Sequence, residues 1–187
     1  MCLTILQNFI KKRNEMLNFK EKLTNVKAFI FDVDGVFSGN IYLSSSGEQW
    51  RSMNIKDGYA VQLAIKKGFP IAIITGGLCK GIQLRFEGLG VKDIFLGSSN
   101  KEEAFQKFIE KYNLNTENIM YMGDDLPDYE VMKKVGLPVC PSDAAQEIIE
   151  ISCYVSSFKG GEGCVRDVIE QVLRAQGKWF DPDAFQW

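Results

Sequence analysis

Acidic side chains stand directly after two apolar runs of this sequence. Asp32 and Asp34 follow a run that starts at Ala28, and Asp124 and Asp125 follow a second run. Carboxylate oxygens are ligands that magnesium prefers, and an ionised aspartate can attack phosphorus. In open α/β sheets, ligands bind beyond the carboxyl ends of the strands. The acids therefore predict a magnesium site with a nucleophile, although Asp-x-Asp-Gly alone is also an ordinary turn sequence.

Two further positions carry groups that suit a phosphate. Thr75 ends a third apolar run and precedes Gly76 and Gly77, and Lys101 opens a stretch with helical spacing. Taken singly, the threonine is typical of a turn and the lysine of a protein surface. At one sheet edge, together with the acids, they predict a site for phosphoryl oxygens.

Composition excludes several other chemistries. The chain of 187 residues has no histidine, which excludes Ser–His and Cys–His nucleophile pairs, phosphohistidine and the usual zinc sites. Five cysteines without a Cys-x-x-Cys pair indicate reduced thiols in a cytoplasmic protein. A net charge of −2 gives no electrostatic case for nucleic acid, and no apolar run approaches the ~20 residues that span a membrane.

The elements that must position these residues alternate along the chain. Apolar runs predict strands at 28–31, 70–74, 94–96, 119–122, 137–139 and 153–155. Helical spacing predicts helices at 57–68, 79–89, 144–151 and 164–175, one that buries Phe105, Phe108 and Ile109, and one after Pro127. We expect a Rossmann-like three-layer α/β sandwich with a mostly parallel central sheet.

One hairpin interrupts this alternation. Residues 37–55 read as two short strands joined by the turn Ser44 to Gly47, which would form a flap over the acids. Asp57 then predicts the N-cap of the next helix.

The chain divides into three parts. Residues 1–25 are interpreted as an N-terminal extension whose first fifteen residues are partly disordered. Residues 26–176 form the predicted domain. The tail 177–187 is rich in aromatic residues, so we expect it to dock on another surface.

The motifs together resemble the haloacid dehalogenase superfamily of phosphotransferases, over residues 27 to about 176. The matching segments are Asp-Val-Asp-Gly-Val at 32–36, Thr75-Gly76, Lys101, and Gly-Asp-Asp-Leu-Pro-Asp at 123–128. The resemblance implies an enzyme that forms an aspartyl phosphate. Asp32 would be the nucleophile, with its pKa held down by the metal and by Lys101. Asp34 would protonate the leaving oxygen and later activate water.

The same resemblance implies the remaining roles. One oxygen of Asp32, the backbone carbonyl of Asp34, and Asp124 would hold Mg²⁺. Thr75, the Gly76 amide and Lys101 would bind the phosphoryl oxygens. Asp125 and Asp128 would orient Asp124, Lys101 or waters on the metal.

A narrower resemblance is to 3-deoxy-D-manno-octulosonate 8-phosphate phosphatases. The supporting segments are 54–64, 123–128 and 160–173. Only about twenty residues separate Gly35 from the next helix, so no cap domain fits. The resemblance implies a capless homotetramer whose flaps meet, with a lid from the neighbouring subunit, acting in lipopolysaccharide precursor synthesis on a small sugar-acid phosphate.

The chain departs from this family at one position. Many members have Thr-Gly-Arg where this chain has Thr-Gly-Gly, so Gly77 would face the leaving group and leave room for a side chain of another subunit. Arg85 and Arg166 are candidates for binding the substrate carboxylate, and a structural salt bridge is an equal alternative for either.

Three other functions remain open from the sequence. A nine-carbon sialic-type sugar acid 9-phosphate would use the same groups. A non-catalytic tetramerisation module of the same superfamily would have lost a catalytic aspartate, and both are present here. A phosphoacceptor signalling domain would need an aspartate at a strand end between the acid pair and the threonine, and none stands there.

Overall fold

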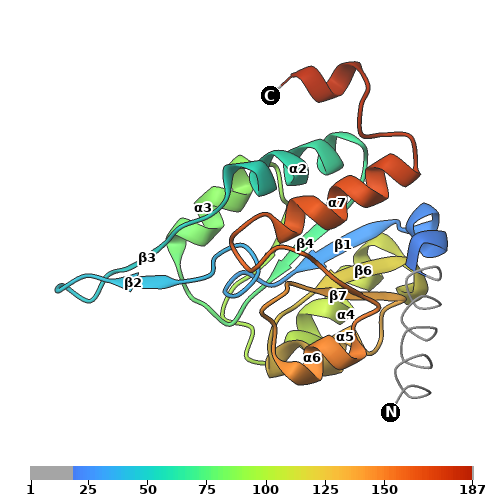
Figure 1. The fold of residues 1–187 in the computed structure, drawn as a ribbon. Coiled ribbons are helices and arrows are strands. Elements are labelled where there is room, and N and C mark those ends of the chain that lie inside the picture. The colour runs from blue at the N-terminus through green and yellow to red at the C-terminus, as the bar shows by residue number, and fades with distance from the viewer. Residues whose placement is uncertain (1–18, 187) are drawn as a thin grey trace, which may run out of the picture.

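Six parallel strands form the central sheet, in the order β5-β4-β1-β6-β7-β8 (Figure 1). Their bounds are Ala28–Phe31 (β1), Ile71–Ile74 (β4), Asp93–Phe95 (β5), Ile119–Met122 (β6), Leu137–Cys140 (β7) and Tyr154–Val155 (β8). The computed structural model describes residues 19–186, so the disorder predicted for the first fifteen residues lies outside the described part.

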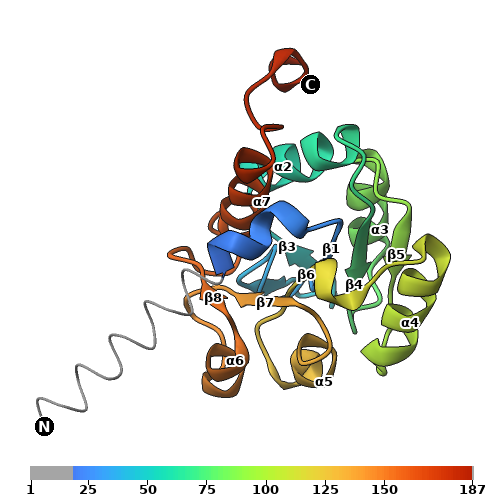
Figure 2. The same cartoon turned by 90° about the vertical axis from the view of Figure 1, so that its right-hand side faces the viewer.

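Helices cover both faces of this sheet. The α-helices are Ile55–Lys66 (α2), Lys80–Gly88 (α3), Lys101–Tyr112 (α4), Tyr129–Met132 (α5), Gln146–Ile151 (α6) and Cys164–Ala175 (α7). Short 3₁₀ turns are Leu23–Asn25 (η1), Thr116–Asn118 (η2), Leu126–Asp128 (η3) and Pro182–Phe185 (η4). Helices α2, α3 and α7 lie on one face, and α4, α5 and α6 on the other (Figures 1 and 2). The predicted three-layer sandwich is confirmed.

The strand β1 shows why the sheet is buried on both sides. All four of its side chains are fully buried. Phe29 and Phe31 pack with the residues of α2 and α7, while Ala28 and Ile30 pack with those of α4 and α5. Successive strand residues point to opposite faces, so a strand between two helical layers is apolar throughout.

A two-stranded antiparallel hairpin, the flap, follows β1 and extends away from the body of the protein (Figure 1). Its strands are Ile41–Leu43 (β2) and Gln49–Arg51 (β3). The turn between them contains Gly47 at φ +83°, a backbone angle that glycine adopts at little cost. Residues 32–54 are all described, and between β1 and α2 they hold this flap and no cap domain.

The predicted N-cap of α2 was wrong. Asn54 caps the helix, and its side-chain oxygen accepts from Lys56 N at 2.8 Å. Asp57 is instead fully buried, and its Oδ1 accepts from Arg166 N at 2.7 Å. That amide belongs to the first turn of α7, which has no side-chain cap at Gly163. Asp57 therefore joins α2 to the start of α7.

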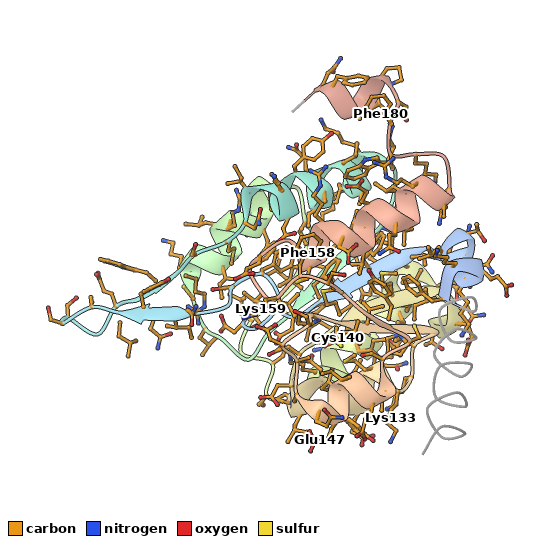
Figure 3. All side chains as sticks on the ribbon, in the orientation of Figure 1. Lys133, Cys140, Glu147, Phe158, Lys159 and Phe180 are labelled. Carbon is orange, nitrogen blue, oxygen red and sulfur yellow. The ribbon has the colours of Figure 1, made fainter. Side chains whose placement is uncertain are left out.

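Part of the C-terminal tail packs on this helical layer. Trp179 is buried, and Tyr59 Oη donates to the carbonyl oxygen of Ala184 at 2.5 Å. Phe180 and Phe185 stay exposed, and Phe180 lies on the tail beyond α7 (Figure 3). At the other end of the described chain, Phe19 is buried and stacks on Tyr154. In the part of the chain described here, no helix has the length and apolar character to cross a membrane.

Candidate active site

The acids that follow β1 and β6 converge at the carboxyl edge of the sheet. These two strands are parallel neighbours, with Phe31 beside Met122, so the residues that follow them emerge together. Carboxylate oxygens of Asp32, Asp124 and Asp128 all lie within 4.8 Å of one another. The cluster is an oxygen-lined position of the kind that hard divalent cations occupy.

A buried lysine closes one side of this cluster. Lys101 Nζ lies 3.0 Å from Asp32 Oδ2 and 2.7 Å from Asp128 Oδ1. Tyr121 Oη also donates to Asp128 Oδ1, at 2.6 Å. The side chain of Asn100 caps α4 and thereby sets Lys101 at its first turn. Lys101 is therefore part of the site, and the alternative of a surface lysine does not hold.

The clustered carboxylates are held in an unfavourable electrostatic environment. Burial, and next the neighbouring Asp128, raise the pKa of Asp32 to about 6. Burial, and next Asp32, raise the pKa of Asp124 to about 7. Lys101 lowers both, as expected for Asp32, but burial outweighs it in the protein without a metal. The prediction of a depressed Asp32 pKa therefore needs the cation, and Lys101 does not achieve it alone.

One carboxylate oxygen of Asp32, the candidate nucleophile, tests whether the site fits a metal ion. Asp32 Oδ1 is buried and, among the described residues, has no hydrogen-bond partner. A buried charged oxygen without a partner is costly. A divalent cation held with Asp124 would satisfy this oxygen and offset the repulsion between the acids, so the residues present fit Mg²⁺.

Glycines allow the acids to approach the backbone. Gly35 adopts φ +90°, and a Cβ there would lie 1.8 Å from Asp124 Oδ2. The glycine-rich loop 160–163, which precedes α7, packs on the same turn, where Gly161 N donates to Val36 O at 2.8 Å. A Cβ on Gly160 would lie 2.0 Å from Gly35 O. Gly35 in the turn after β1 and Gly160 in the loop before α7 therefore both allow the close packing of that turn.

Thr75 reaches the same edge from β4, the other neighbour of β1 in the sheet. The residue is buried, and its Oγ1 accepts from Gly77 N at 3.2 Å. Gly76 is exposed, with open space where a side chain would be. Thr75 and Gly76 thus directly follow the strand beside β1, whereas Lys101 reaches the site from α4.

The sequence reasoning missed one residue at this site. Arg51, at the end of β3 in the flap, folds back and forms a two-pronged ion pair with Asp34. Its Nε donates to Oδ1 at 2.6 Å, and Nη2 donates to Oδ2 at 2.9 Å. Nothing in the local sequence separates this arginine from one that faces solvent. The only available signal was the position of the flap beside the acids.

Asp125, Arg85 and Arg166 make their contacts outside the acid cluster. Asp125 is exposed and caps η3 through a bond from Leu126 N at 2.8 Å. Arg85 lines a cavity of about 340 Å³ between the flap and α3. Arg166 lies on α7, where its Nε pairs with Glu170 at 3.1 Å and its guanidinium stacks on Trp179. A substrate role for either arginine stays a prediction.

Fold and site together define a class: a Rossmann-like α/β protein with an acid cluster, a buried lysine and a threonine at the carboxyl ends of neighbouring strands. Residues 78–166 match the family described as haloacid dehalogenase-like hydrolase. The 3-deoxy-D-manno-octulosonate 8-phosphate phosphatase of Escherichia coli is 42% identical over 84% of this chain and 84% of its own.

Solved structures agree with this match. A 3-deoxy-D-manno-octulosonate 8-phosphate phosphatase from Yersinia pestis has a TM-score of 0.84 and 36% identity, covering 86% of this chain and 88% of its own. The Moraxella catarrhalis enzyme, in complex with magnesium, phosphate and KDO, has a TM-score of 0.83 and 31% identity, covering 89% and 95%. This chain therefore belongs to the 3-deoxy-D-manno-octulosonate 8-phosphate phosphatase family of haloacid dehalogenase-like hydrolases.

Proposed function

We propose that this protein is a magnesium-dependent phosphatase that hydrolyses 3-deoxy-D-manno-octulosonate 8-phosphate to the free sugar acid and phosphate. The observation that carries the proposal is the convergence of Asp32, Asp124 and Lys101, with one buried Asp32 oxygen that no described residue satisfies. Family membership supports the substrate, and the complex of the Moraxella catarrhalis enzyme with magnesium, phosphate and KDO supports both the metal and the substrate.

The metal would be held by Asp32, Asp124 and the backbone carbonyl of Asp34. Asp128 is less available as a ligand because Lys101 and Tyr121 both contact its Oδ1, and Asp124 N lies 3.4 Å from its Oδ2. We assign Asp128 the task of orienting Lys101 and the backbone at Asp124. When bound, Mg²⁺ screens the repulsion between the phosphate and the carboxylates.

The first half-reaction transfers the phosphoryl group to Asp32. An Asp32 oxygen attacks phosphorus, the bond from phosphorus to the sugar oxygen breaks, and that oxygen takes a proton from Asp34. Thr75, the Gly76 amide and Lys101 would bind the phosphoryl oxygens, where negative charge concentrates in the transition state. The contact from Lys101 to Asp32 also keeps the attacking carboxylate in place.

The second half-reaction reverses the role of Asp34. Having lost its proton, Asp34 takes one from a water molecule, which attacks the aspartyl phosphate and releases inorganic phosphate. One carboxyl group therefore serves both halves of the reaction, and Asp32 returns to its starting state.

The flap supports a homotetramer in which a neighbouring subunit contributes the lid. Its side chains at Ile41, Tyr42, Leu43 and Trp50 are exposed and between 44% and 73% accessible. Apolar side chains grouped on a projecting hairpin are typical of an interface between subunits. Cys79, Cys140 and Cys164 carry free thiols, in accord with a cytoplasmic enzyme.

The decisive assay measures phosphate release from a panel of sugar-acid phosphates. We expect turnover of the eight-carbon 8-phosphate with Mg²⁺, and loss of that turnover when a chelator removes the metal. A nine-carbon sugar acid 9-phosphate, tested in parallel, distinguishes the two substrate classes. Preference for the nine-carbon compound would overturn the substrate, and turnover unaffected by the chelator would overturn the metal.

A further inference from the structure

Arg51 is the one buried side chain on the strands of an otherwise exposed flap, all of which the structure describes. Every other residue of β2 and β3 is exposed, whereas the Arg51 side chain retains only 6% of its accessible surface. Burying a guanidinium is unfavourable unless it is paired. Asp34 is the only carboxylate that pairs with Arg51 in the described part of the chain. The flap therefore brings the guanidinium of Arg51 to Asp34, the residue assigned as acid and base.

The pair lies where the reacting groups meet. A Cβ built on Gly77 would lie 3.6 Å from both Arg51 Nη2 and Asp34 Oδ2, and 3.5 Å from Thr75 Oγ1. The room over Gly77, expected to receive a side chain of another subunit, is thus bordered by this chain's own Arg51.

Both oxygens of Asp34 accept hydrogen bonds from Arg51 in this arrangement. A carboxyl group that carries a proton keeps acceptor capacity at both oxygens, so Arg51 can hold Asp34 with or without the proton. The Nε contact at 2.6 Å is shorter than the Nη2 contact at 2.9 Å. Nη1 is buried without a partner among the described residues, so the guanidinium is not fully held by protein acceptors.

We propose that Arg51 is the positioning residue for Asp34. The Nε and Nη2 contacts together fix the orientation of the carboxyl group, and Oδ2, which faces the room over Gly77, carries the proton to the leaving oxygen. The electron pair of the breaking phosphorus–oxygen bond stays with that oxygen, which receives the proton. The proposal rests on the phosphatase function above, and it ties the acid to the position of the flap.

Leaving-group dependence tests this role. Aryl phosphates with acidic phenols need little protonation of the leaving oxygen, whereas those with weakly acidic phenols need an acid. For Arg51→Ala we expect kcat/KM to fall roughly 10- to 100-fold with the poorest leaving group and less than about threefold with p-nitrophenyl phosphate. Arg51→Lys, which keeps the charge but not the two-pronged geometry, should recover only part of the loss.

A double-mutant cycle assigns the effect to Asp34. In an Asp34→Asn background, Arg51→Ala should cause no further leaving-group dependence, because its target has been removed. Glu48→Ala, an exposed flap variant outside the site, is the matched control and should keep the wild-type kinetics. Thermal unfolding with and without Mg²⁺ verifies that each variant is folded and retains the metal site.

Two results would overturn the inference. An equal loss with every leaving group, or a rise in KM alone, would mean that Arg51 binds substrate or fastens the flap. Wild-type kinetics in Arg51→Ala would exclude any role. Failure of the phosphatase proposal is distinguishable, since the unaltered enzyme would then show no magnesium-dependent hydrolysis of any phosphate.

Discussion

The carboxyl edge of the sheet and the flap contribute to the same site in opposite ways. The edge is built from strand ends between two helical layers, and its Asp32, Lys101 and Asp128 are buried. The flap is a two-stranded hairpin with exposed apolar side chains and a single inward arginine, Arg51. A rigid, buried edge suits metal binding and nucleophilic attack, which require fixed distances. An extended hairpin suits contact with other subunits and adjustment around a substrate.

The largest expected effect comes from the edge. Asp32→Asn removes the attacking oxygen's charge while keeping the side-chain shape, so turnover should fall by roughly 10⁴-fold or more. The fold should persist, because the substitution removes a buried charge and keeps the packing. Phosphate release and circular dichroism measure the two consequences. Normal activity in this variant would remove Asp32 as the nucleophile.

Substitutions of exposed apolar residues in the flap should disrupt the tetramer while leaving the chemical groups of the site intact. In the double variant Leu43→Ser, Trp50→Ser, we expect the tetramer to dissociate, because exposed apolar surface on the hairpin is lost. Light scattering after size exclusion reports the mass. Activity on the sugar-acid phosphate should fall about tenfold, while p-nitrophenyl phosphate, which needs no lid, should keep most of its rate.

A matched change elsewhere controls for the loss of apolar surface. Leu84→Ser alters an exposed leucine of α3 outside the flap, and the tetramer should survive it. A full-size tetramer in the flap variant, or full activity in a monomer, would contradict the borrowed lid.

The smallest effect concerns a buried acid outside both regions. Burial raises the pKa of Asp57 to about 6, from an ordinary value of 3.8, as burial also does for Asp32. At pH values between 3.8 and about 6, Asp57 therefore keeps its proton in the folded protein but has released it in the unfolded chain. The contribution of Asp57 to the free energy of unfolding should fall as the pH rises through that window, by about 3 kcal/mol, and level off above it.

Asp57→Asn should remove this component. Relative to the wild type, the variant should gain stability progressively from about pH 4 to about pH 6, since it cannot ionise. Urea unfolding across this range, with the catalytic acids common to both proteins, isolates the difference. A constant difference between the two proteins at all pH values would disprove the assignment to Asp57.

Much of the edge was accessible to sequence reasoning because its determinants are local. The strand at Ala28–Phe31 and the helix at Cys164–Ala175 have the predicted bounds, since a continuous apolar run and a glycine-led amphipathic stretch each specify one element. The convergence of the acids could be predicted because they follow parallel strands that end at one edge of the sheet. Asp57 was misassigned because Asn54, one turn earlier, is an equally good cap and Ile55 is exposed despite being apolar.

The order of residue types along the chain was enough to determine the layered sheet and the acids that meet at its edge, because burial and turn chemistry act within a few residues. Only the packed fold could decide that Arg51 turns inward to Asp34, that Asp57 caps a helix more than a hundred residues away, and that burial raises the pKa of Asp32 despite Lys101. Those outcomes depend on the direction of a hairpin, the contact between two helices and the exclusion of water, none of which is encoded by neighbouring residues alone.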